Sequence, residues 1–211
     1  MQLVLHDPRS GEPARPTHLA ACEAAACAAV RLLDDARSRP GGPWHERVAR
    51  WNGGPIRKVV RRARGVRWAA TEELPHVEVA AGAVVRAFVP APLDHVPDVL
   101  ARLQVGGTDL PDAGTPAPAV LGGVTVALTP RHPLTTGKAA AQGAHAAHLA
   151  WHMLPDLTAW RATGFAVRVL LPAAREWPAT VRRSVVQVRD AGFTEVPPGT
   201  VTAVAWPTGD L

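Results

Sequence analysis

The 211-residue sequence contains no tyrosine, and it has only two cysteines and two lysines. Cys22 and Cys27 lie five residues apart in one predicted helix, so they point about 140° away from each other, which argues against a disulfide bond between them. Free thiols fit a reducing compartment, and we expect a cytoplasmic protein. The start, MQLVLHDPRS, has no basic segment followed by a long apolar one, and no run of residues is long and apolar enough to cross a bilayer. We therefore expect neither a signal peptide nor a membrane span.

Composition favours a folded chain with an anionic partner. Apolar residues make up 47% of the sequence and charged residues 19%, with a mean hydropathy of +0.01. The formal net charge is +5 and the sequence pI about 10.5, which favours an anionic partner without identifying it. Since nearly all the basic residues are arginines, a lysine in a special position suggests a role for a compact ammonium group.

The order of predicted elements occurs twice along the chain. The first half reads as strands at 2–6, 56–63 and 84–90, a long helix at 17–35, and short helices near 44–51 and 68–74. The second half reads as strands at 124–128, 166–171 and 185–190 and one ending at 207, a long helix at 138–154, and a short helix at 177–184. Segments 77–90 and 194–207 also align without a gap, which pairs Glu78 with Glu195 and Gly82 with Gly199.

This repeat predicts an α/β protein of two similar units, each a mixed β-sheet flanked by helices, arranged as an intrachain pseudo-dimer. We expect a degenerate unit at 1–105, a Gly/Pro/Ala-rich linker at 106–123 and a second unit at 124–211.

One lysine begins the long helix of the second half. Lys138 follows Gly137, where free backbone N–H groups and the positive end of the helix already attract anions. Gln142 and His145 lie on the same face, and together the three form a polar stripe on an alanine-rich helix. The stripe predicts a site for a phosphate or a developing oxyanion. A solvated lysine at a helix start is the simpler alternative.

A second constellation is VRDAGFTEVPPGT, in which Asp190 ends an apolar strand and Thr194 and Thr200 follow around a turn. An aspartate and two threonines can hold a water molecule and a substrate hydroxyl, with the carboxylate as general base or orienting acceptor. The alternative is a turn in which Asp190 caps its own loop.

The first half provides an internal comparison for both constellations. In our alignment Lys138, Gln142 and His145 fall on Leu19, Glu23 and Ala26, whereas Asp190, Thr194 and Thr200 fall on Glu73, Val77 and Ala83. The polar set is lost as a group, which predicts one active unit and one structural unit.

These residues carry a resemblance to a known family. TGKAAAQGAHAA and VVQVRDAGFTEVPPGTVTAVAWP resemble the type 2 peptidyl-tRNA hydrolases, whose patterns are GK-x-AAQ-x-AHAA and RDAG-x-T-x-x-x-PGT. The similarity covers residues 124–207. It implies a mixed sheet between helices, homodimeric assembly, no metal or other cofactor, and hydrolysis of the ester that joins a peptide to the terminal ribose of tRNA.

Carried over by position, the resemblance makes Lys138, Asp190, Thr194 and Thr200 catalytic, and it places Gly137, Gln142 and His145 beside the substrate. Asp190 would position or deprotonate water, and Lys138 would stabilise the oxyanion or hold a terminal phosphate. Phe193 stands where the family often has Arg, and Glu195 where it often has Gln. Both changes remove polar contacts beside the site.

The stretch IRKVVRRARGVRW is strongly basic. We interpret it as a surface that follows tRNA phosphates, and a solvated edge strand protected by charge is the alternative. The candidate substrate-binding residues in it are Arg57, Lys58, Arg61 and Arg62. His145, His148 and His152 share a helix face, but they lack acidic or cysteine partners at ligand spacing, so we expect no metal site.

The sequence therefore predicts a peptidyl-tRNA hydrolase, monomeric as a pseudo-dimer, with peptidyl-tRNA as partner. A catalytically weak or inactive RNA- or protein-binding module on the same fold is the first alternative. A hydrolase of small esters or amides, which would need no basic groove, is the second. Convergence of Lys138, Asp190 and Thr194 on one accessible cleft would favour an enzyme over a binding module.

Overall fold

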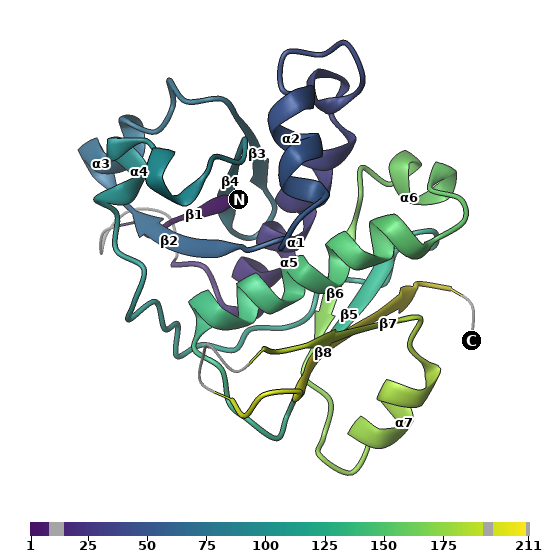
Figure 1. Cartoon of the computed structure of the whole chain (residues 1–211). Coiled ribbons are helices and arrows are strands. Elements are labelled where there is room, and N and C mark those ends of the chain that lie inside the picture. The colour runs from purple at the N-terminus through teal and green to yellow at the C-terminus, as the bar shows by residue number, and fades with distance from the viewer. Residues whose placement is uncertain (9–14, 192–195, 210–211) are drawn as a thin grey trace.

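The structure is a computed structural model that describes residues 1–8, 15–191 and 196–209 (Figure 1). We call the part with the first sheet the first unit and the part with the second sheet the second unit. The first unit contains β1 (Gln2–His6), α1 (His18–Asp34), α2 (His45–Asn52), β2 (Val59–Ala63), α3 (Gly65–Ala69), β3 (His76–Ala80), β4 (Val84–Phe88) and α4 (Asp98–Ala101). The second contains β5 (Val124–Leu128), α5 (Thr136–Met153), α6 (Thr158–Ala162), β6 (Val167–Leu170), α7 (Trp177–Arg183), β7 (Val186–Arg189) and β8 (Val201–Pro207). Two short 3-10 helices, Ala36–Ser38 and Leu93–His95, complete the first unit as described.

The two sheets have the same topology. Their strand orders are β2-β1-β4-β3 and β6-β5-β8-β7. In each sheet the first two strands are parallel and the other two neighbouring pairs are antiparallel. The chain is therefore an α/β protein with two four-stranded mixed sheets flanked by helices, as the sequence predicted at this level.

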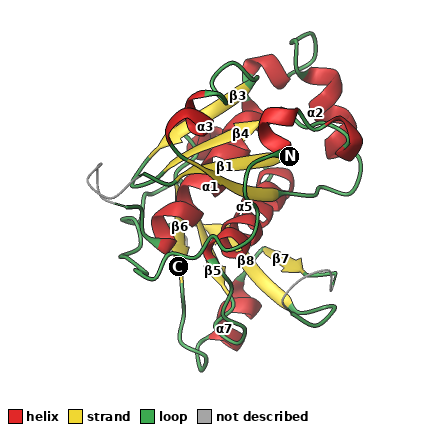
Figure 2. Ribbon diagram, turned by 90° about the vertical axis from the view of Figure 1, so that its left-hand side faces the viewer, coloured by secondary structure: helices red, strands yellow, loops and turns green. Residues whose placement is uncertain are grey.

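The long helices α1 and α5 pack against each other between the sheets (Figure 2). Their contact faces consist mainly of buried alanines, which allow the two backbones to approach closely. Helix α1 also contacts β3, β4 and β6, whereas α5 contacts β5, β7, β8 and β2. Each long helix thus lies on its own sheet and also reaches the edge strand of the other sheet.

The outer faces of the sheets have smaller apolar clusters. In the first unit, Phe88 and Val4 pack with Leu100 of α4 and Leu103. In the second unit, Trp177 of α7 packs with Trp206 of β8. In Figure 1, α7 lies on the side of the second sheet opposite α5. Among the helices in the described part of the chain, none is both long enough and apolar enough to span a bilayer.

The segment 106–123 is held against the starts of both long helices. The carbonyl of Thr108 accepts a hydrogen bond from Gly137 N at 3.0 Å. The carbonyls of Asp112 and Ala113 accept from His18 N at 2.8 Å and Leu19 N at 3.1 Å. The structure describes the whole of the expected linker, which contains no helix or strand. Its backbone carbonyls accept hydrogen bonds from free N–H groups in the first turns of α1 and α5.

Candidate active site

Asp190 directly follows β7 at the carboxyl end of that strand. Its backbone N–H donates to the Thr200 carbonyl at 2.9 Å, and its carbonyl accepts from Gly199 N at 2.8 Å. These two bonds fix the base of the loop between β7 and β8. Asp190 is only 7% exposed, so it is a buried residue.

Helix α5 brings two of the predicted residues to this carboxylate. The Nε2 group of Gln142 donates to Asp190 Oδ2 at 2.9 Å, and Lys138 Nζ lies 3.9 Å from the same oxygen. The spacing of four residues places Lys138 and Gln142 one above the other on α5. The side chain of Lys138 is 16% exposed, so its ammonium group lies at the edge of the site rather than in the core.

A third residue, Thr202, fixes the orientation of Gln142. Its hydroxyl donates to Gln142 Oε1 at 2.8 Å, and Thr202 is fully buried in β8. Because the amide oxygen accepts from this hydroxyl, the amide nitrogen faces Asp190. Thr202 was not among the residues predicted from the sequence. The sequence feature that indicates it is the presence of a threonine within the otherwise apolar strand β8.

This arrangement can activate a water molecule. A carboxylate that a buried amide holds in place can accept a proton or orient a nucleophile. An ammonium group beside it can stabilise negative charge that develops on a neighbouring oxygen. Lys138, Gln142 and Asp190 therefore form the candidate site, and Thr202 supports it.

Three other residues predicted for the site are Thr200, Gly137 and Thr194, of which the structure describes the first two. The hydroxyl of Thr200 donates to the Pro197 carbonyl at 2.7 Å, within the loop itself. The backbone amide of Gly137 donates to the carbonyl of Thr108 in the linker. This amide is therefore occupied, and the prediction that it binds an anion is wrong. Thr194, together with Phe193 and Glu195, lies outside the described residues.

His145 belongs to a different network, at the contact between α5 and β2. Lys58 Nζ lies 3.4 Å from His145 Nδ1 and 2.9 Å from His148 Nδ1. The carboxamide oxygen of Asn52 lies 2.7 Å from His148 Nε2 and 2.9 Å from His152 Nε2. Lys58 Nζ can donate to Nδ1 of His145 and of His148, and Nε2 of His148 and of His152 can donate to the Asn52 oxygen, so all four contacts are satisfied within the protein.

Lys58 therefore does not belong to a phosphate-binding surface, and that prediction is corrected. The residue is only 8% exposed, and burial holds the pKa of its amine well below the ordinary value. Burial and the neighbouring Lys58 also hold the pKa of His145 well below its usual range.

The basic stretch divides between structure and surface. Arg61 donates to Gln2 Oε1 at 2.9 Å and to the Leu103 carbonyl at 2.8 Å, so it fastens β2 to its neighbours. Arg57 is exposed. Arg62 lies 3.6 Å from Asp7 and lines a surface pocket of about 360 Å³ at the carboxyl end of β2. The other basic residues lining this pocket are Arg15, Arg64 and Arg67.

The first unit has no equivalent of this site among its described residues. In the topology, the residue that follows β3 is Ala81, so Ala81 and not Glu73 corresponds to Asp190. Glu23, aligned with Gln142, instead accepts at Oε1 from Ala117 N at 2.8 Å and from Val169 N at 2.9 Å. The loss of the polar set from the first unit is therefore greater than the alignment indicated.

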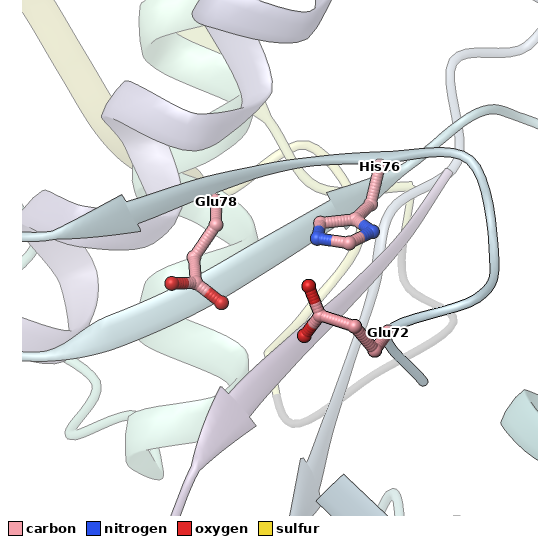
Figure 3. Close-up of side chains that lie close together, drawn as sticks. All are labelled: Glu72, His76 and Glu78. Carbon is pink, nitrogen blue, oxygen red and sulfur yellow. The ribbon is translucent and has the colours of Figure 1, made fainter. Parts of the chain in front are cut away.

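One group of side chains has the spacing of metal ligands. Figure 3 shows Glu72, His76 and Glu78 facing one another, with ligand atoms within 4.8 Å. Arg86, however, forms ion pairs with both carboxylates, including a bond to Glu78 at 2.8 Å. Because the guanidinium already neutralises both acids, the geometry favours an ion-pair network that joins the segment before β3 to the hairpin.

No protein-family model, curated protein or solved structure matches this chain.

Proposed function

We propose that the protein hydrolyses the ester bond between a peptide and the 3′-terminal ribose of tRNA, using the site in its second unit. The single observation that carries the proposal is the contact of Asp190 with Gln142 at 2.9 Å and Lys138 at 3.9 Å. These are residues of the two separated motifs that resemble type 2 peptidyl-tRNA hydrolases.

In the proposed reaction, Asp190 orients a water molecule and accepts its proton as the oxygen attacks the ester carbonyl. Lys138 stabilises the negative charge on the tetrahedral intermediate or holds the terminal phosphate of the tRNA. Gln142 acts as a positioning residue, since it keeps the carboxylate of Asp190 in one orientation. No metal ion or other cofactor enters the proposed steps.

We further infer that the units are diverged copies that form a pseudo-dimer within one chain. The shared strand order and the packing of α1 on α5 support this. The first unit would then serve tRNA binding through Arg57 and the arginine-lined pocket at the end of β2. Figure 1 draws the end of β2 and the start of α5 on the same side of the molecule, which suits one extended polyanion. Such a substrate implies a cytoplasmic protein.

The test is release of the blocked amino acid from N-acetyl-aminoacyl-tRNA. Asp190→Asn and Lys138→Ala should each lower turnover by about two orders of magnitude, the usual effect of losing one such group. Asp98→Asn, at an exposed carboxylate in α4, is the matched control and should keep full turnover. Unchanged turnover in both site variants would exclude this site.

The alternative of a non-catalytic RNA-binding module is favoured by one observation. Arg64 and Arg67 are exposed beside the pocket and need no intact site in the second unit. Retention of tRNA by the wild-type protein without any release of the amino acid would favour that function.

A further inference from the structure

A cavity of about 610 Å³ lies between the two units, away from the Asp190 site. Its walls come from one face of α1 between Ala20 and Arg31, the turn after β3, the linker and the starts of β5 and β6. A volume in the range of roughly 300–1,000 Å³ is typical of pockets for small organic ligands.

This cavity occupies the corner of the first unit that corresponds to the candidate active site of the second. Lys138 lies in the first turn of α5 and Asp190 directly after β7. The cavity is bounded by Ala20 in the first turn of α1 and by Ala81 directly after β3. The same corner therefore lacks the two charged groups and presents small apolar side chains at those positions.

The polar groups of the cavity come from both units. Glu23 is fixed by its two backbone hydrogen bonds and is 8% exposed. Burial raises the pKa of its carboxyl group. From the second unit, Arg168 also lines the cavity, and its Nε is buried with no hydrogen-bond partner in the described part of the chain. The side chain of Arg31 lies at the same cavity and is exposed.

These features differ in what they would recognise. Two guanidinium groups suit a phosphate, because they can donate paired hydrogen bonds to its oxygens. The wall formed by Ala20, Ala24 and Val79 suits a flat apolar body such as a base. A fixed carboxyl group can exchange hydrogen bonds with base nitrogens or ribose hydroxyls.

We propose that this cavity binds a nucleoside monophosphate, with the phosphate at Arg168 and Arg31 and the nucleoside against the alanine wall and Glu23. The site would be a second binding site, without hydrolytic groups, in the unit that lacks the aspartate. This inference does not depend on the proposed hydrolysis, because binding is measured directly.

Titration calorimetry with AMP, adenosine and inorganic phosphate tests the proposal. AMP should bind saturably, and adenosine and phosphate alone should each bind at least about tenfold more weakly. Arg168→Gln and Glu23→Gln should each weaken AMP binding by about tenfold or more, with melting temperatures measured to confirm folding. Arg175→Gln, at an exposed arginine outside the cavity lining, is the matched control for charge.

Lys138→Ala separates this site from the candidate active site, and it should leave AMP affinity unchanged. The proposal is overturned if AMP does not bind, or if Lys138→Ala weakens binding as much as Arg168→Gln does. Displacement of AMP by deacylated tRNA would identify the tRNA end as the source of the nucleotide, whereas no displacement would identify a free nucleotide.

Discussion

Acid should loosen the contact between α5 and β2, and His148 allows the size of this effect to be worked out. His148 is fully buried, its Nδ1 accepts from Lys58, and its Nε2 donates to Asn52. A proton on Nδ1 would therefore meet a donor rather than an acceptor. Burial, followed by the nearby Lys58, lowers the pKa of His148 from 6.5 to about 2.

The sign follows from which state binds the proton first. Below about pH 6.5 the unfolded chain takes up a proton at this residue while the folded chain does not, so stability decreases as the pH falls. Each pH unit in this window costs about 1.4 kcal/mol, so a change from pH 6.5 to pH 5 should cost about 2 kcal/mol from His148 alone. The lowered pKa of His145 acts in the same direction below about pH 6.5, and the lowered pKa of Lys58 already makes stability decrease as the pH falls below its ordinary value of 10.5.

Urea unfolding at about pH 7, 6 and 5 measures this effect. In His148→Gln, which cannot titrate, the loss of stability across this range should be smaller than in the wild type by about 2 kcal/mol. The matched control is His95→Gln, at an exposed histidine far from α5 in sequence, and it should keep the wild-type dependence. Equal pH dependence in the wild type and His148→Gln would refute the argument that His148 is held neutral by burial.

Two further predictions concern the candidate site and the basic surface. Gln142→Leu removes the donor to Asp190 and the acceptor of Thr202, so it should lower kcat by about 10- to 100-fold with little change in KM, while Gln187→Leu on the exposed face of β7 leaves both unchanged. A large rise in KM with normal kcat in steady-state assays of Gln142→Leu would contradict a positioning role. Joint replacement of Arg62, Arg64 and Arg67 by Gln should reduce the salt dependence of tRNA binding by a slope of about 0.7–0.9 for each phosphate that the protein no longer neutralises, whereas Arg182→Gln in α7 should not. An unchanged slope in filter-binding measurements at several salt concentrations would remove the pocket from the tRNA path.

The sequence predicted the parts of the fold that repeat with clear periodicity. Strands β1 and β5 and helices α1 and α5 were recognised because apolar runs and alanine-rich stretches bury whole faces. Strand β3, HVEVA, was not recognised as a separate strand, since only Val79 is buried and the rest of the strand is half-buried or exposed. The short helix expected at 68–74 lies instead at Gly65–Ala69.

The error over Lys58 has a simple origin. The prediction takes the basic stretch as one continuous surface, although a strand alternates its side chains between two faces. Lys58 shares a face with Val60, which is buried in the core, and the same alternation would have placed the lysine inside. Its histidine partners could not have been predicted, because they come from α5 in the other unit.

The sequence alignment wrongly pairs Asp190 with Glu73 because the two hairpins, β3–β4 and β7–β8, differ in length. The gap-free alignment of 77–90 with 194–207 correctly matches β4 to β8, since it pairs Val84 with Val201 and these residues begin the two strands. It does not match β3 to β7, because the loop after β7 is longer than the tight turn between Ala80 and Val84. The loop that presents Asp190 is therefore longer than its counterpart in the first unit, the turn at 81–83, and a gap-free alignment cannot match the two.

The two corners show where the chemistry of the candidate site must come from. In both units, backbone amides at the start of the long helix donate hydrogen bonds to linker carbonyls. The backbone of the helix start is therefore similar in the two corners. The difference between the corners lies in side chains and loop length: Lys138 and Asp190 in one, and Ala20 and Ala81 in the other. Gln142 on α5 holds the carboxylate of Asp190 in the second unit, whereas Glu23 on α1 accepts a hydrogen bond from the edge strand β6, so polar side chains of the two long helices serve a candidate site in one unit and contact between the units in the other.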